Sequence, residues 1–318
     1  MSPLLAGLVA AGMGLPHVLR LERAAPGVAA TIWFGALALR ALTAILCALF
    51  VILYVPATAL FGLISHWCWH AVVPFLTTHL HFDGHALGDA TLTVPTFVLA
   101  ASLLSVVVGL YRAARQVQIL LRRTVGEGPD ESVLLADGEM LVAAAGIRHP
   151  RVLVSAGALL AFDDEELAAS LEHERGHIAR RHRYLLVLAE LFRALARFLP
   201  GTRAAMRELV FHLERDADRY AIARDHDPSV LASAICKAAV ASRPSVPTMG
   251  LGGGVVTRRI GLLLEQEPGA SRSSHRALKL VAAAMLTLAL LGAGTVPSAA
   301  HAGYHGAAGS GPERPCQV

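Results

Sequence analysis

Four long apolar segments constrain the fold of this chain more than any other feature of its sequence. A helix of about 20 apolar residues crosses the hydrocarbon core of a bilayer, and segments of roughly 17 or more are long enough to do so. The composition agrees, since 54% of the 318 residues are hydrophobic and only 16% are charged. We therefore expect an α-helical membrane protein with about four transmembrane helices. They cover residues 3–19, 41–63, 92–111 and 278–297.

The start of the second segment depends on Arg40. The apolar run extends back to Val28, and Arg40 interrupts it. Our main interpretation starts the span at Ala41, with Trp33 and Phe34 in an interfacial stretch before it. The alternative is a tilted span that begins near Val28, from which Arg40 extends its guanidinium to the membrane surface.

The distribution of basic residues predicts the orientation in the membrane. Arginines follow the first and third segments and precede the fourth, whereas residues 65–91 contain neither arginine nor lysine. The positive-inside rule then places the region between the third and fourth segments in the cytoplasm and both termini outside. Because a composition rich in arginine and alanine is typical of GC-rich bacterial genomes, we expect a multi-pass protein of the bacterial plasma membrane.

This orientation divides the chain into four parts. Residues 1–111 form a membrane region whose outer loop, residues 65–91, is rich in histidine. Residues 112–276 form a cytoplasmic domain, 278–297 the fourth membrane helix and 298–318 a short disordered outer tail. The loop histidines lack the spacing of a defined site, which favours an interfacial loop over a second metal site or a pH sensor. The net charge of +4 does not indicate nucleic-acid binding, because the arginines are scattered around apolar spans.

The motif His-Glu-Arg-Gly-His, from His173 to His177, is the part of the cytoplasmic region that indicates chemistry. Histidines four residues apart lie on one face of a helix, so both imidazoles can reach one zinc ion. Glu174 lies near the same face and can act on a water molecule instead of binding the metal. Upstream, Asp163 and Glu166 form a capping-box signature, which predicts a helix with the motif at its middle.

A catalytic zinc site also requires a third protein ligand and an open fourth position. Glu214 and Asp218 lie four residues apart and share a helical face, so one can bind the metal while the other orients a ligand histidine. His182, His212 and Asp216 are competing third ligands, and the spacing alone leaves these alternatives open. On a continuous helix, His212 and Asp216 point away from the face of Glu214 and Asp218.

The residues before the motif predict a small β-sheet beside the motif helix. Glu131–Ala136 and Glu139–Ala144 flank Asp137 and Gly138, a strong hairpin signal. Arg151–Ser155 is expected as a third strand at the edge of the sheet, where a substrate peptide would add as a further strand.

Two later segments have simpler interpretations. Tyr184–Leu199 is apolar but carries charges, so we expect an amphipathic helix and not a further span. Gly250–Gly254 lacks the lysine and spacing of a phosphate-binding loop, and a flexible connection is expected there.

The run from Arg151 through the motif to His182, followed by Glu214 and Asp218, resembles the membrane-embedded zinc metallopeptidases of the gluzincin class. The sequence is most similar to the BlaR/MecR-type sensor-transducer peptidases, and the HtpX-type proteases are near relatives. The resemblance covers roughly residues 130–265 and implies an α+β peptidase domain that binds one zinc ion per chain.

The resemblance also implies a role for each site residue. His173, His177 and Glu214 would bind zinc, Glu174 would be the general base, and Asp218 would support His173. The chain departs from the family at Glu172, where a small or apolar residue is usual.

The function implied is hydrolysis of peptide bonds in a cytoplasmic or membrane-proximal protein. The BlaR/MecR resemblance points to regulatory cleavage of a transcriptional repressor, whereas an HtpX-like protease would degrade damaged membrane proteins. A third alternative is a signalling or scaffold protein that keeps the fold without catalysis. The expected partners are a protein substrate and the lipid bilayer.

Overall fold

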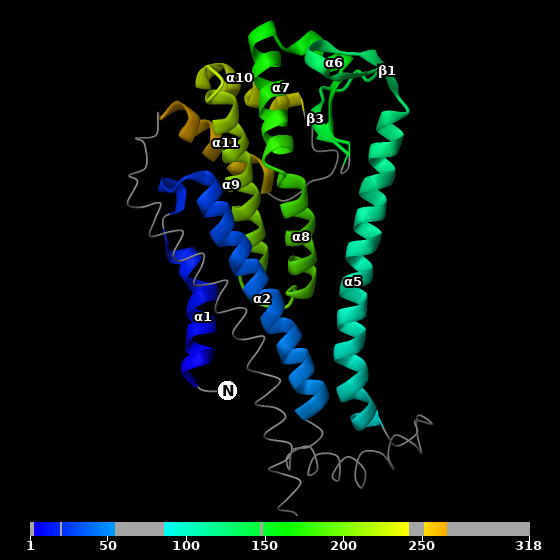
Figure 1. Ribbon diagram of the computed structural model, residues 1–318, viewed down its shortest axis with the longest axis vertical. Helices are drawn as coiled ribbons and strands as arrows, with labels where there is room; N and C mark the ends of the chain where they lie inside the picture. Colours follow the sequence, from blue (N-terminus) through cyan, green and yellow to red (C-terminus); the bar gives the residue numbers. More distant parts are fainter. Residues whose placement is uncertain (1–2, 20, 55–85, 147–148, 242–250, 266–318) are drawn as a thin grey trace, which may run out of the picture.

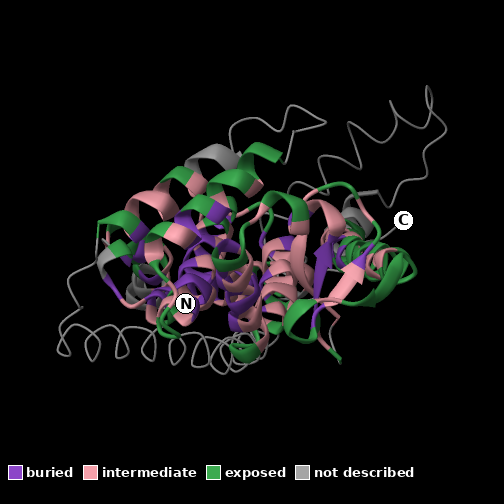
Figure 2. Ribbon diagram, turned by 90° about the horizontal axis from the view of Figure 1, so that it is seen from above, coloured by how far each residue is buried: buried purple, intermediate pink, exposed green. Residues whose placement is uncertain are grey.

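The computed structural model describes residues 3–19, 21–54, 86–146, 149–241 and 251–265 (Figure 1). Three helices, α1 (Pro3–Val18), α2 (Pro26–Tyr54) and α5 (Ala86–Leu121), precede a small sheet. Further helices follow the sheet: α6 (Ala156–Ala161), α7 (Asp164–Ala179), α8 (His182–Leu195), α9 (Thr202–Ile222), α10 (Pro228–Ala241) and α11 (Leu251–Leu264). Seen from above, the buried residues gather between the helices and on the strands (Figure 2).

Within the described ranges, two helical stretches are long and apolar enough to cross a membrane, Pro26–Ile52 and Thr93–Leu121. Three of the four expected spans begin in this part of the chain, and two of them are found. The helix α1 coincides with the first expected span but is shorter than a span requires, and residues 278–297 lie outside the described ranges. On α5, Phe97 and Leu104 expose most of their surface, as lipid-facing side chains do.

The second expected span begins earlier than Ala41, because α2 is already helical from Pro26. Arg40 does not reach the membrane surface either, since it is only 2% exposed. Its guanidinium contacts three carbonyl oxygens and an imidazole nitrogen: Met13 O at 2.7 Å, Ala36 O at 3.1 Å, Pro200 O at 3.3 Å and His17 Nε2 at 3.0 Å. These contacts satisfy the buried guanidinium inside the helix bundle.

The helix α2 packs against α8 and α9 and joins the apolar part of the chain to the motif region (Figure 1). Buried alanines on both sides, Ala29 and Ala36 on α2 and Ala205 on α9, permit close approach of the backbones. Ile32 and Leu209 fill the space between them and are fully buried. The predicted amphipathic helix at Tyr184–Leu199 is confirmed as α8, which lies in this contact.

The sheet has four strands in the order β1-β2-β4-β3. The strands are β1 (Thr124–Glu127), β2 (Val133–Leu135), β3 (Val142–Ala145) and β4 (Arg151–Ser155). The strand β4 pairs in parallel with β2 and antiparallel with β3, so it is a central strand.

Two expectations about the sheet are wrong. The strands β2 and β3 do not form a hairpin, because β4 lies between them. The strand β4 has the predicted bounds but not the predicted edge position, which β3 occupies. The reason is burial: Val152, Leu153 and Val154 are all buried, so both faces of β4 are covered, as in a central strand.

The helix α7 is confirmed with the predicted cap. The Asp163 side chain accepts from the Glu166 amide, and the Glu166 side chain accepts from the Asp163 amide. Leu171 packs against Val152 and Val154 of β4, so one face of α7 lies on the sheet. The residues of the motif are thereby held between the sheet and α9.

Candidate active site

Donor atoms of three side chains, two from α7 and one from α9, converge at one point. His173 Nε2 lies 3.2 Å from His177 Nε2 and 3.6 Å from Glu214 Oε2, and His177 Nε2 lies 3.5 Å from Glu214 Oε1. Tetrahedral zinc with ligands at about 2.0–2.2 Å requires donor separations of about 3.3–3.6 Å. The three side chains therefore fit a zinc ion without rearrangement.

A glycine in the motif permits this convergence. A Cβ added at Gly176 would lie 3.0 Å from Tyr220 Cβ and 3.2 Å from Ala217 Cα, so no larger residue fits without moving α9. The close approach of α7 and α9 brings Glu214 within reach of both histidines. The close approach of the two helices thus explains why this motif position is a glycine.

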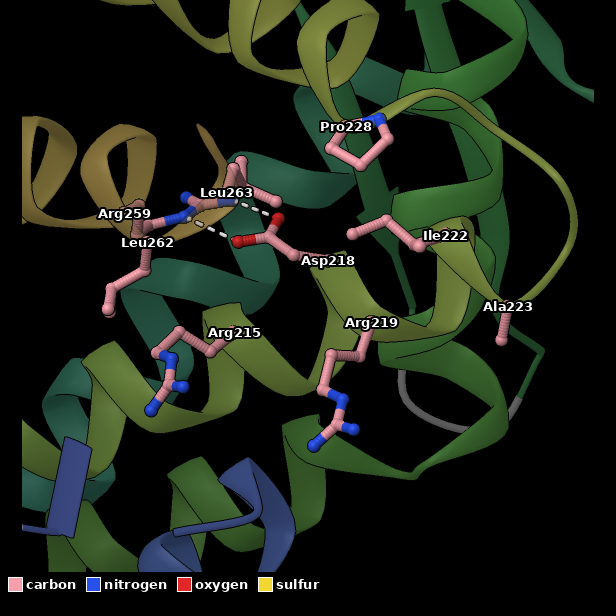
Figure 3. Close-up of a pocket in the computed structure, with 9 residues that line it drawn as sticks. All are labelled: Arg215, Asp218, Arg219, Ile222, Ala223, Pro228, Arg259, Leu262 and Leu263. Carbon is pink, nitrogen blue, oxygen red and sulfur yellow. Dashed lines mark hydrogen bonds and ion pairs between the residues drawn. The ribbon is translucent and has the colours of Figure 1, made fainter. Parts of the chain in front are cut away.

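The outer nitrogen of His173 is held by a carboxylate. His173 Nδ1 lies 2.9 Å from Asp218 Oδ1, as the resemblance implies. Arg259 of α11 then donates to both oxygens of Asp218, at 2.7 and 3.1 Å (Figure 3). It also donates to Glu214 Oε2 at 2.7 Å. One arginine, whose side chain is 11% exposed, therefore fixes both carboxylates relative to His173.

The sequence interpretation missed Arg259. It assigned Gly250–Gly254 to a flexible connection, whereas α11 begins at Leu251. Arg259 and Glu214 lie on different helices, so no helical spacing in the sequence relates them. Only the tertiary fold brings them together. The available signal was a pair of arginines, Arg258 and Arg259, in an otherwise apolar stretch between Val256 and Leu262.

The remaining candidate ligands lie outside the donor set. His182 is buried and its Nδ1 lies 3.0 Å from His177 Nδ1, behind the metal position. Asp216 Oδ2 lies 3.2 Å from His182 Nε2, so Asp216 is linked to the donor set through His182. His212 is fully buried beside Arg215 and contacts none of the three donors.

Burial and neighbouring charges shift the pKa values of the three donors in different directions. Burial raises the pKa of Glu214, but the hydrogen bond with His173 and the charge of Arg259 outweigh it and lower that pKa to about 2. Burial is the main cause that lowers the pKa of His177 to about 4. Burial also lowers the pKa of His173, but its contacts with Asp218 and Glu214 outweigh this and raise it to about 9. A zinc ion must therefore displace a proton from His173 at neutral pH.

Glu174 lies beside the donors and next to the edge of the sheet. Its Oε2 accepts a hydrogen bond of 2.7 Å from the amide of Ala144 on β3. Burial raises its pKa, which brings the carboxylate closer to the range in which it can accept a proton.

A pocket opens on each side of Glu174, and both pockets are bordered by β3 and by Glu214. The first is mostly apolar, and its lining includes Met140, Val142, Phe162, Leu231, Ile235 and Val256. The second is lined by the small residues of β3 together with Val117, Ile178, Arg183 and Leu186. Both pockets therefore lie beside β3 and share Glu174 and Glu214 in their linings.

The helix-borne histidine pair, the glutamate from a later helix and the adjacent sheet define a zinc metallopeptidase domain of the HExxH class. The family model described as peptidase family M48 matches residues 114–243, which run from the end of α5 past α10 and contain the three donors. This part of the chain is therefore similar to the M48 peptidases, and Arg259 lies beyond the matched residues. No curated protein matches the chain.

Proposed function

We propose that this protein is a membrane-anchored zinc endopeptidase that cleaves a cytoplasmic or membrane-proximal protein. The observation that carries the proposal is the convergence of His173, His177 and Glu214 beside Glu174. The apolar helices α2 and α5 support membrane anchoring. We place the peptidase region, residues 112–276, in the cytoplasm, because several arginines follow the apolar part of α5.

The mechanism assigns one task to each residue. His173, His177 and Glu214 hold zinc, which when bound activates a water molecule and polarises the scissile carbonyl. Glu174 removes a proton from the attacking water and delivers it to the leaving amine. Asp218 and Arg259 keep His173 and Glu214 in position.

The edge of β3 is the proposed substrate site, in place of Arg151–Ser155. A peptide added to this edge receives main-chain hydrogen bonds, and its alternate side chains enter the pockets beside Glu174. Because the first pocket is lined by large apolar residues, we expect a preference for an apolar substrate side chain there.

The decisive test is the Glu174→Gln variant, with Glu165→Gln as its control because Glu165 is an exposed glutamate of the same helix. Glu174→Gln should bind zinc as the wild type does, while cleavage of β-casein falls by about 10²–10⁴-fold. Glu165→Gln should retain wild-type cleavage. Full activity of Glu174→Gln would refute the mechanism, and wild-type protein without zinc or cleavage would favour the scaffold alternative.

For the biological substrate, we propose regulatory cleavage of a transcriptional repressor, on the BlaR/MecR resemblance of residues 151–182 together with Glu214 and Asp218. The alternative is HtpX-like quality control of membrane proteins. Cells carrying wild-type protein or Glu174→Gln should differ in repressor integrity and in the transcripts that the repressor controls. A repressor that stays intact under every inducing condition would refute the regulatory proposal.

A further inference from the structure

Behind the metal position lies a second polar contact chain that ends at a carboxylate. His177 has its Nε2 near Glu214 and its Nδ1 3.0 Å from His182 Nδ1. His182 in turn has its Nε2 3.2 Å from Asp216 Oδ2. These contacts therefore link Asp216 through His182 to His177, whereas Asp218 contacts the other histidine, His173.

The hydrogens in this chain can be assigned from chemistry. If His177 uses Nε2 for the metal, its Nδ1 carries the proton and donates it to a neighbour. The neighbour, His182 Nδ1, must then be the acceptor, and the proton of His182 is on Nε2. Since Asp216 is only an acceptor when ionised, it receives that proton's hydrogen bond, and each contact has one donor and one acceptor.

The backbone is shaped to bring His182 to this place. Arg181, between α7 and α8, has φ of +57°, a left-handed conformation that is uncommon for residues other than glycine. This turn lets the first residue of α8 point back at the last histidine of the motif. His182 is 2% exposed, so its two ring nitrogens need partners inside the protein.

Asp216 is held in its ionised form by its surroundings. Arg180 Nε lies 3.8 Å from Asp216 Oδ2, so a positive charge faces this carboxylate in addition to His182. The first turn of α2 also lies against Asp216, since a Cβ at Gly27 would be 3.4 Å from Oδ1. The positive end of a helix favours a carboxylate there.

We propose that His182 and Asp216 are positioning residues for the zinc ligand His177, the counterpart of Asp218 for His173. They fix the tautomer and ring orientation of His177 and increase its basicity as a ligand. This inference rests on the proposed zinc site. The competing interpretation is a buried pair that only stabilises the fold.

The test measures the zinc affinity of the full-length protein in detergent by competition with a chelator. His182→Asn keeps an acceptor oxygen near the place of Nδ1, His182→Phe keeps a ring without an acceptor, and His182→Ala keeps neither. His182→Ala and His182→Phe should raise the zinc Kd by roughly 10–100-fold, and His182→Asn should recover most of that loss. Asp216→Ala should weaken zinc binding less than His182→Ala, because it is one contact further away.

Two further measurements separate positioning from folding. The absorption bands of Co²⁺-substituted protein should shift in His182→Phe and return toward wild type in His182→Asn, because they report the ligand geometry. His212→Ala removes another buried histidine and should lower the thermal midpoint without changing the zinc Kd per folded chain.

The outcomes distinguish a failure of the proposed zinc site from a failure of the positioning role. Wild-type protein that binds no zinc would refute the proposed function itself. Wild-type protein that binds zinc, together with equal Kd values for wild type and His182→Ala, would refute only the positioning role. If His182→Ala does not fold, equal Kd values for His182→Asn and His182→Phe would refute it in the same way.

Discussion

Two buried polar clusters lie at opposite ends of the α8–α9 pair, and they are built differently. At the metal end, Asp218 and Glu214 are paired with Arg259 and with the motif histidines, so charge is balanced by opposite charge. At the other end, Arg40 contacts carbonyl oxygens and His17, and no carboxylate among the described residues pairs with it.

The chemistry of the partners indicates the role of each cluster. Carboxylates and imidazoles held by charged partners can exchange a proton for a metal ion, so the metal end is suited to chemistry. Carbonyl groups are fixed in the backbone and carry no net charge. Arg40 therefore ties together the backbones of α1, α2 and the α8–α9 turn, and that end is suited to holding the helices in place.

The largest expected effect comes from Glu214→Ala, which removes a metal ligand and leaves Arg259 with Asp218 as its remaining partner. Zinc affinity should fall by more than the roughly 100-fold limit for outer contacts, and proteolysis should be lost with it. Metal analysis of purified protein checks this result. Glu208→Ala on the same helix, which breaks a pair with Arg258, is the control and should keep its zinc. Stoichiometric zinc in Glu214→Ala would contradict the assignment of the third ligand.

Asp218→Ala should have the next largest effect, because it frees His173 Nδ1 without removing a donor. Loss of such an outer contact typically reduces metal affinity or activity by roughly 10–100-fold. A chelator titration of Asp218→Ala beside Asp218→Asn checks the prediction, and the asparagine should be the milder change because it retains an acceptor oxygen. Unchanged zinc affinity in both variants would contradict the role of Asp218 at the metal end, and with it the contrast between the two clusters.

Arg40→Met tests the other cluster. The substitution leaves the carbonyls of Met13 and Pro200 without their buried donor, which should cost about 1–3 kcal/mol of folding stability. The zinc Kd of the folded fraction should remain at the wild-type value. Thermal unfolding in detergent and chelator titration give the two readings. A large loss of zinc affinity at unchanged stability would show that Arg40 belongs to the chemistry after all.

The smallest effect is expected at Glu166, which pairs with Lys237 away from both clusters. Burial raises its pKa, but hydrogen bonds from Lys237 and Ser233 outweigh this, so the folded-state pKa lies below the usual value. The stability that it contributes is therefore present above the unfolded-state pKa and is lost as the pH falls through the folded-state pKa. Glu166→Gln should flatten the acid side of the stability profile by less than about 1 kcal/mol, because Lys237 is partly exposed. An unchanged profile would contradict this assignment.

Local signals in the sequence were sufficient for the centre of the site. The capping box at Asp163 and the spacing of His173 and His177 depend only on helical geometry, and both are confirmed. Glu214 was one of several third ligands by spacing, and the resemblance singled it out.

What the sequence did not reveal depends on contacts between distant segments. The order of the strands is decided by which strand is buried on both faces, and a turn signal such as Asp137-Gly138 does not contain that information. The position of Arg259 and the burial of Arg40 require knowledge of which helices lie opposite them. In each case the missing information was the identity of a tertiary neighbour, which local sequence preferences do not contain.

The hydrogen bond between Ala144 and Glu174 has a consequence for the protein at rest. An open strand edge is a template on which any extended chain can pair, including another copy of the same protein. The strand β3 is only four residues long, and one of its amides is already occupied by Glu174. A stray strand would have to displace that carboxylate before it could pair fully. Glu174, the proposed general base, therefore also hinders aggregation of the resting protein along this edge.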